Sequence, residues 1–193
     1  EQGDVHRAVA LRAYVEGIEA IPHTVEFYLY EGILPGYAWI FPTGNNSANM
    51  GIGMRLDKFH QQKKSLEEMF EQFLHLPYHQ QRLSQIVVHD MASWPLNFGS
   101  PKQLRRAFDG ALLVGDAGAF INPLTGGGIE NAMLSARLAA QTIHTALKKD
   151  DTSWSMLHPY EKQCNDLFTG GMRRSFWLNR LLLRFPSTVD FLI

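Results

Sequence analysis

The sequence has one cysteine, no surplus of either charge, and no hydrophobic run long enough to span a bilayer. Cys164 has no partner for an internal disulfide, which favours a reducing compartment, so we expect a cytoplasmic protein. Lys and Arg total 18 and Asp and Glu total 19, a balance that argues against nucleic acid as the main partner. His75, His79 and His89 lack metal-ligand spacing, so we expect no metal site.

A dinucleotide-binding signature is also missing. Such folds open with a strand, then G-x-G-x-x-G and a helix. Gly51-Ile52-Gly53 lies within a strand pattern and has neither the third glycine nor the helix. The chain starts at Glu1 without a methionine, and its 193 residues suffice for one domain or one and a half. We therefore expect a C-terminal fragment of a longer protein.

The first half of the chain contains a series of strand patterns, over residues 5–14, 23–30, 37–41 and 47–56. A turn at 43–46 joins the last two as a hairpin. Residues 64–76 read as an amphipathic helix, and a further strand lies within 85–96. These elements predict an antiparallel sheet with one helix, which we assign to residues 1–107.

Two sets of residues stand out in the predicted sheet. Tyr37, Trp39 and Phe41 alternate to one side of their strand, an arrangement that suits either a core or a ligand-binding wall. Gly51 and Gly53 share one face of the next strand. Glycines weaken a strand unless something lies close to its backbone. The pair therefore fits a bulge, a tight sheet crossing, or a flat group or substrate chain lying across the sheet.

From Ala111 to Ile143 the sequence reads as strand, turn, glycine loop and helix. Residues 111–114 form an apolar run that suits a strand buried on both faces. Asp116 follows at its carboxyl end, where open α/β sheets usually place a ligand. Six apolar residues then recur on one face of the helix: Ile129, Met133, Ala136, Ala140, Ile143 and Leu147.

The glycine loop itself predicts a binding site for an oxygen with partial negative charge. Gly126–Gly128 put three backbone N–H groups without side-chain cover at a helix N-terminus, and Thr125 is a candidate for the helix N-cap. Unsatisfied donors and the helix dipole both attract such an oxygen. Taken alone, a loop of clustered glycines is also a common connector between elements.

Two blocks of the sequence resemble a known flavoprotein family. Gly115-Asp116-Ala117 followed by Asn122-Pro123-Leu124-Thr125-Gly126 resembles the second FAD-binding motif of the p-hydroxybenzoate-hydroxylase class, in the form found in geranylgeranyl reductases. Residues 34–42 (LPGYAWIFP) resemble the Pro-Gly-Tyr-x-Trp-x-Phe-Pro block of those reductases, and residues 48–53 continue it. One departure is Gly127, where the reductase pattern usually carries Glu.

The resemblance implies that FAD is the cofactor. Asp116 would accept a hydrogen bond from a ribityl hydroxyl, and the backbone of Gly126–Gly128 would face the pyrimidine edge of the isoalloxazine. Pro123 would lie near the reactive edge of the flavin, with Gly115 and Thr125 completing the cofactor-binding set. Because only this half of the site is present in the sequence, we expect weak or no retention of FAD.

The resemblance also implies a substrate and a reaction. The sheet would wall a cavity for an apolar prenyl chain, lined by Tyr37, Trp39, Phe41, Gly51 and Gly53. The reaction would be reduction of an isoprenoid C=C bond by hydride from N5 of FAD, with a proton from an acid or water. Tyr37 and His23 are candidates for the proton donor. The electron donor, NAD(P)H or another reductant, is not identified.

Two other functions are compatible with the sequence. An FAD-dependent monooxygenase or halogenase of the same fold typically carries G-x-G-x-N leading into Asp-Ala after the proline, a tail that residues 128–132 do not match. The other is a non-catalytic fragment that binds lipid or protein. Upstream of the predicted buried strand, Lys102, Arg105 and Arg106 suit a solvated face or a phosphate clamp.

We therefore predict an α/β fragment with three regions. These are an antiparallel substrate-domain sheet at 1–107, the returning strand and helix of a Rossmann-like FAD domain at 108–150, and a C-terminal helical segment at 151–193. The last segment interleaves apolar residues with arginines, which suits domain packing, a substrate-tunnel wall or a membrane surface. Peripheral association with a membrane is therefore a further expectation, and the sequence does not fix the oligomeric state.

Overall fold

The computed structural model describes residues 3–19, 21, 23–44 and 46–184. The chain divides into two compact units, residues 1–96 and 97–193. The sequence prediction placed the first boundary at 107 and separated a third region from 151 onward. The first boundary differs because the segment that follows residue 96 packs with the later helices, as described below. Residues 185–193 of the predicted helical segment lie outside the described part of the chain.

The first unit is built on a five-stranded sheet with the order β2-β3-β4-β1-β5. Its strands are β1 (Arg7–Glu16), β2 (Glu26–Tyr28), β3 (Gly36–Gly44), β4 (Ser47–Arg55) and β5 (Val87–Asn97). β4 pairs antiparallel with β1 and with β3, and β2 pairs antiparallel with β3. The predicted antiparallel sheet is confirmed, although the second strand is far shorter than the predicted 23–30.

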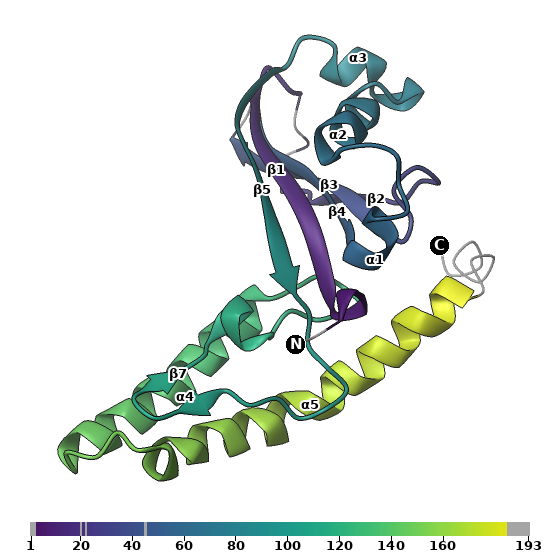
Figure 1. The fold of residues 1–193 in the computed structure, drawn as a ribbon. Helices are drawn as coiled ribbons and strands as arrows, with labels where there is room; N and C mark the ends of the chain where they lie inside the picture. The colour runs from purple at the N-terminus through teal and green to yellow at the C-terminus, as the bar shows by residue number, and fades with distance from the viewer. Residues whose placement is uncertain (1–2, 20, 22, 45, 185–193) are drawn as a thin grey trace. The chain divides into compact units, whose positions relative to one another are not determined.

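One face of this sheet carries the core of the first unit. The inward residues of β4 are Ala48, Met50, Ile52 and Met54, each of them buried, as the alternation predicts. They pack with the apolar side of α2 (Leu66–Leu74), which includes Phe70 and Phe73. α2 lies against this face in Figure 1. Its N-terminus is fixed by a capping box in which Ser65 and Glu68 bond each other's backbone amides.

Shorter elements complete the first unit around α2. They are a 3-10 turn η1 (Asp4–His6), α1 (Leu56–Phe59), a 3-10 turn η2 (Pro77–His79) and α3 (Gln80–Leu83). Leu83 of α3 joins the same core. The opposite face of the sheet is formed by the outward side chains of the strands.

The second unit contains β6 (Ala107–Phe108), β7 (Ala111–Leu112), a 3-10 turn η3 (Gly115–Gly118), α4 (Ile129–Lys148) and α5 (Trp154–Arg184). α4 and α5 lie side by side (Figure 1). Their core includes Phe120, Ala139, Tyr160, Cys164 and Phe168. No helix in the described part of the chain is both long and apolar enough to cross a membrane.

The prediction of a buried strand over 111–114 is wrong in extent and in burial. β7 ends at Leu112 and pairs only with β6, in a sheet of two strands. Ala111 and Val114 are exposed. A strand with one neighbour in so small a sheet is not covered on both faces, so the apolar run does not form the interior strand that its composition suggested.

The apolar face predicted for α4 exists, but it faces away from the core of its own unit. Ile129, Met133 and Leu147 are 82%, 70% and 66% exposed. The buried residues of α4 are Ser135, Ala139 and Ala146, which lie on the side that packs with α5. Small side chains allow two helices to approach closely, so this contact uses alanine and serine rather than the larger residues of the predicted face.

Candidate functional site

The glycine loop brings Asp116 next to Gly128. A β-carbon at Gly128 would lie 3.6 Å from Oδ1 of Asp116 and 3.0 Å from Cγ1 of Ile121. Asp116 is exposed, and the Gly128 amide has no hydrogen-bond acceptor among the described residues. Gly128 is also the N-cap of α4 and makes no side-chain cap. An open acceptor and an open donor therefore lie side by side at the start of a 20-residue helix.

The prediction of three uncovered glycine amides is wrong for two of them. The Gly126 amide donates to the carbonyl of Asn122 at 2.9 Å, and the Gly127 amide donates to Oγ1 of Thr125 at 3.2 Å. The Thr125 hydroxyl thus accepts a hydrogen bond within the loop and does not cap α4. Asn122 also accepts, at Oδ1, from the amides of Leu124 and Thr125 at 2.9 and 3.3 Å. The loop folds on Asn122, a role for which the Asn-Pro step was the only signal in the sequence.

The turn that carries Asp116 is held from two elements. Gly115 has a φ of +54°, a left-handed conformation that favours glycine, and its amide donates to Oγ of Ser135 in α4 at 3.1 Å. A β-carbon at Gly115 would also come within 3.3 Å of Cβ of Ala132. At the other end of η3, the carbonyl of Gly118 accepts from Nε of Arg106 at 2.6 Å. Asp116 is therefore fixed on both sides by residues outside the motif.

Arg106 is buried, so the prediction of a solvated face or a phosphate clamp is wrong for this residue. Its Nη1 donates to Oδ1 of Asn165 in α5 at 2.9 Å, and its guanidinium lies 4.3 Å from the ring centre of Phe120. Burial lowers the pKa of Arg106. Arg105, one residue earlier, is exposed. The sequence offered no way to tell the two arginines apart, because their environments are set by α5.

The remaining predicted cofactor-site residues lie in the same loop. Pro123 is buried, whereas Thr125 and Gly127 are exposed and Gly126 is half-buried with a φ of +70°. All seven predicted residues thus belong to one segment of the second unit, from η3 to the start of α4. The structure brings Asp116 and Gly128 together, and it buries Pro123.

In the first unit, the outward face of the sheet carries a row of aromatic rings that we call the aromatic surface (Phe27, Tyr37, Trp39 and Phe41). The centroids of Tyr37 and Phe41 lie 6.0 and 6.1 Å from that of Trp39. Phe27 of β2 makes edge contacts with Tyr37 and Phe41 at 5.5 and 5.3 Å. Tyr37, Trp39 and Phe41 therefore form the predicted row, and Phe27 joins it without having been singled out from the sequence.

Gly51 and Gly53 lie beneath this row, and the flat group that crosses them belongs to the protein. A β-carbon at Gly51 would fall 2.3 Å from Cζ2 of Trp39 and 2.3 Å from the carbonyl oxygen of Leu11. Trp39 is oriented by its Nε1, which donates to Oδ1 of Asn49 at 2.8 Å. Gly51 is buried. Its predicted place in the substrate-contacting surface is thus taken by the Trp39 indole.

The two candidate proton donors differ in setting. Tyr37 is half-buried on the aromatic surface, and burial raises the pKa of its hydroxyl. A tyrosine hydroxyl is protonated at neutral pH even at its ordinary pKa, and the raised pKa makes the hydroxyl of Tyr37 a weaker acid. His23 is exposed in the segment before β2, with a φ of 58°. Of the two, only Tyr37 belongs to the aromatic surface.

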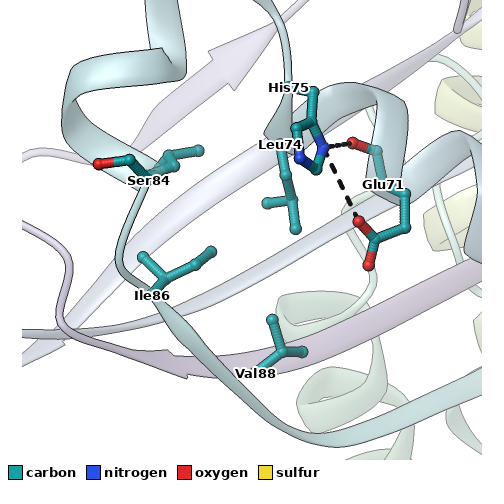
Figure 2. A pocket seen from close by; sticks show the side chains of 7 residues that line it. Glu71, Leu74, His75, Ser84, Ile86 and Val88 are labelled. Carbon is teal, nitrogen blue, oxygen red and sulfur yellow. Dashed lines mark hydrogen bonds and ion pairs between the residues drawn. The ribbon is translucent and has the colours of Figure 1, made fainter.

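A cavity of about 520 Å³ lies elsewhere in the first unit, lined by Glu71, Leu74, His75, Leu83, Ser84, Ile86 and Val88 (Figure 2). Aliphatic side chains form the floor of the cavity. The polar groups at its rim interact with residues close by in the sequence. Nδ1 of His75 lies 2.8 Å from the carbonyl oxygen and 3.8 Å from Oε2 of Glu71, one helical turn earlier. The cavity shares no residue with the aromatic surface. Within the described residues no group of three or more His, Cys, Asp or Glu side chains could hold a metal ion.

Residues 6–93 match the family described as the geranylgeranyl reductase catalytic domain. A digeranylgeranylglycerophospholipid reductase from Thermoplasma volcanium is 33% identical over 161 residues, which cover 82% of this chain and 39% of that protein. A second, from Methanopyrus kandleri, is 36% identical over 144 residues, 72% of this chain and 36% of that protein. The chain thus spans less than half the length of the curated relatives it matches.

Among solved structures, a geranylgeranyl bacteriochlorophyll reductase-like protein from Thermoplasma acidophilum matches with a TM-score of 0.81 and 27% identity, over 93% of this chain and 44% of that chain. The flavin-dependent brominase Bmp2 has a TM-score of 0.61 and 18% identity over 98% of this chain and 50% of that chain, a likeness of fold alone. The mixed α/β fold with its antiparallel sheet and C-terminal helices therefore agrees with the prediction. Together with the motifs at residues 34–53 and 115–128, these matches make the chain a member of the geranylgeranyl reductase family.

Proposed function

We propose that the chain supplies a substrate-binding wall and part of the FAD site of a flavin-dependent reductase that saturates C=C bonds of a prenyl lipid. The observation that carries the proposal is the Asp116 carboxylate lying beside the free amide of Gly128. Relatives named digeranylgeranylglycerophospholipid reductases support the prenyl-lipid class of substrate.

The residues of the loop fit FAD. Asp116 is an exposed acceptor suited to a ribityl hydroxyl, and the Gly128 amide is a donor at the positive end of the α4 dipole. A side chain at Gly128 would crowd Ile121, so glycine keeps the backbone approachable. Gly115 and Gly126 hold the loop in shape through their left-handed conformations. When bound, FAD would supply hydride transfer.

The aromatic surface fits an apolar chain. A prenyl substrate offers no polar groups along its length, so its binding depends on apolar area, at about 0.8 kcal/mol per buried CH₂ group. Phe27, Tyr37, Trp39 and Phe41 provide a continuous apolar wall, and the only polar atom of the Trp39 ring is already bonded to Asn49. We assign Tyr37 as the proton donor, because of the two candidates it is the one that lies on this wall.

A peripheral contact with a lipid surface is part of the proposal. The outward residues before and after Phe27 are Val25 and Leu29, and all three are exposed. Exposed apolar side chains at the edge of a sheet suit an approach to a membrane in which the substrate would reside.

Binding of FAD is tested first. Because the chain holds only part of the site, we expect titration of the 193-residue chain to give weak binding that saturates only at high FAD concentration, read by flavin fluorescence and visible absorption, and Asp116→Asn to weaken it about 10-fold through loss of a charge-assisted hydrogen bond. Asp150→Asn is the control, because Asp150 is an exposed carboxylate of the same unit in a left-handed conformation that asparagine also adopts. Equal effects of the two substitutions on FAD affinity would show that Asp116 is not part of the FAD site.

The reaction is tested with FAD, NAD(P)H and a geranylgeranyl lipid supplied together. A reductase adds H₂ at each saturated C=C bond, which mass spectrometry detects in the lipid. Incorporation of oxygen or halide, with consumption of O₂, would instead identify a monooxygenase or halogenase. Binding of prenyl lipid without any binding of FAD would support a non-catalytic fragment.

A further inference from the structure

The edge strand β2 has different roles on its two faces. It has three residues and pairs only with β3, where Phe27 lies opposite Trp39. Because side chains alternate along a strand, Phe27 belongs to the aromatic surface while Glu26 and Tyr28 face the helix-covered side. Three residues provide few ladder hydrogen bonds, so the position of Phe27 depends on what holds its neighbours.

On the outward side, Phe27 contacts two other rings of the aromatic surface. Its centroid lies 5.5 Å from that of Tyr37 and 5.3 Å from that of Phe41, and both contacts are edge-to-face. Its side chain is 58% exposed. Aromatic edge contacts contribute about 1 kcal/mol each, which is too little to fix a short edge strand.

On the helix-covered side, Glu26 is clamped by Arg82 of α3. Nη1 and Nη2 of Arg82 donate to the two carboxylate oxygens of Glu26 at 2.7 Å each, and Nε donates to the carbonyl of Glu19 at 2.7 Å. Tyr28 donates its hydroxyl to Glu26 as well, and its ring packs edge-on against Phe73. The side chains of Arg82 and Glu26 are only 20% and 14% exposed, so solvent screens the pair little.

We propose that Arg82 is a positioning residue for the substrate wall, holding β2 so that Phe27 completes the aromatic surface. The planar guanidinium satisfies both oxygens of Glu26 and also the chain before β2, a geometry that an ammonium group cannot reproduce. Arg82 acts through Glu26 and does not reach the aromatic surface, because Glu26 and Phe27 point to opposite faces. The inference rests on the proposed function, in that it assigns Phe27 to prenyl binding.

The experiment uses Trp39 as a reporter. Trp94, Trp154 and Trp177 are exposed, so Trp94→Phe, Trp154→Phe and Trp177→Phe together leave Trp39 as the single tryptophan at little structural cost. In this background we would compare Arg82→Gln, Arg82→Lys, Phe27→Ala and the pair Arg82→Gln with Phe27→Ala. Titration with geranylgeraniol measures prenyl binding through Trp39 emission. Acrylamide quenching without lipid measures how accessible the Trp39 ring is to solvent.

The matched control is Arg55→Gln. Arg55 forms another bidentate pair, with Asp57 at 2.8 and 2.6 Å, and is similarly shielded, but it joins the end of β4 to α1. Loss of this pair removes the same kind of interaction from the same unit without releasing Glu26. Circular dichroism and the midpoint of thermal unfolding establish that each variant is folded.

We expect Phe27→Ala to weaken geranylgeraniol binding about 10-fold and Arg82→Gln to weaken it about 5-fold, with Arg82→Lys between Arg82→Gln and the parent chain. The double variant should bind no more weakly than Phe27→Ala alone, because Arg82 acts through Phe27. Arg55→Gln should stay within about 2-fold of the parent chain. Acrylamide quenching of Trp39 should rise in both Arg82→Gln and Phe27→Ala.

Fold-changes for Arg82→Gln and Phe27→Ala that multiply in the double variant would overturn the inference, as would an equal loss in Arg55→Gln. If the parent chain does not bind geranylgeraniol, the substrate assignment fails, but the acrylamide measurement still decides whether Arg82 holds Phe27. Should Arg82→Gln not fold, Glu26→Gln replaces it, since it breaks the same pair while retaining a hydrogen-bonding side chain.

Discussion

The Trp39 indole occupies the space that a side chain at Gly51 would fill, with Cζ2 of the ring 2.3 Å from the position of a β-carbon there. The aromatic surface therefore depends on a glycine in the neighbouring strand. Nothing larger than hydrogen fits between the ring and the backbone of β4.

Gly51→Ala should displace Trp39 and destabilise the chain by about 1–3 kcal/mol, because the added methyl would overlap both the ring and the backbone carbonyl of Leu11. Urea unfolding and the emission maximum of Trp39 measure the two effects. Gly53→Ala is the matched control, since a β-carbon there would lie 3.4 Å from Cβ of Ala10 and 3.8 Å from the Trp39 ring, ordinary contact distances. Equal destabilisation by both substitutions would contradict the packing argument.

The stability of the first unit should fall with acid through His79. Burial lowers the pKa of His79 to about 4. The unfolded chain gains a proton on this residue as the pH falls through about 6.5, whereas the folded chain does not until about 4. The free energy of unfolding is therefore complete above pH 6.5 and declines between about 6.5 and 4. The lowered pKa of Glu26, due first to its hydrogen bond from Arg82, adds a loss only below its ordinary 4.5.

His79→Phe should flatten the decline between pH 6.5 and 4. The ring of His79 packs against Tyr28 and Phe73 with centroids 4.8 Å away in each case, and within the described chain its Nε2 is buried without a hydrogen-bond partner. Phenylalanine keeps the ring and removes that buried polar atom, so it should also stabilise the chain at neutral pH by about 1 kcal/mol. His75→Gln, at an exposed site, should leave the pH dependence unchanged, and urea unfolding at several pH values provides the measurement.

Arg106→Met should destabilise the second unit by about 2–4 kcal/mol. The buried carbonyl of Gly118 would lose the Arg106 donor, and Oδ1 of Asn165 would keep only the Leu104 amide at 3.4 Å, although the aliphatic part of the side chain is retained. Arg105→Met, at the exposed neighbouring position, should cost less than about 0.5 kcal/mol. Thermal unfolding of both variants gives the comparison, and similar costs would show that Arg106 is not needed to hold the turn.

Gly128→Ala should weaken FAD binding about 10-fold or more while leaving α4 intact, because the added methyl would crowd Ile121 and cover the backbone amide beside Asp116. Gly127→Ala is the comparison, at an exposed position where the nearest atom is the Thr125 hydroxyl at 3.3 Å. Flavin fluorescence gives the affinity, and circular dichroism reports helix content. An unchanged affinity in Gly128→Ala would place FAD away from the start of α4.

Residue patterns within single elements predicted the first unit well. The strand predicted over 47–56 and the amphipathic helix predicted over 64–76 are both present, as β4 and α2, because each depends on local periodicity. The glycine pattern left a bulge, a tight sheet crossing and a flat group over β4 open, and it did not indicate that Trp39 would be the flat group. That contact depends on strand register, which Gly51 and Gly53 do not reveal on their own.

The features that the sequence did not predict are those set by distant partners. Glu26 and Arg82 are 56 residues apart, and Arg106 and Asn165 are 59 residues apart. Charge and neighbours in sequence are similar for Arg105 and Arg106, yet α5 buries one and leaves the other exposed. For α4 the periodicity established that an apolar face exists, but the small residues on another side made the contact with α5.

The bonds that close the glycine loop all come from its own unit: Asn122 with Gly127, Gly115 with Ser135, Phe120 with Asn131, and Gly118 with Arg106. No residue of the sheet contributes to these bonds. The aromatic surface can therefore be redesigned for longer or shorter lipids one ring at a time. The geometry around Asp116 should stay the same in each variant, so that a change in lipid binding can be attributed to the altered ring.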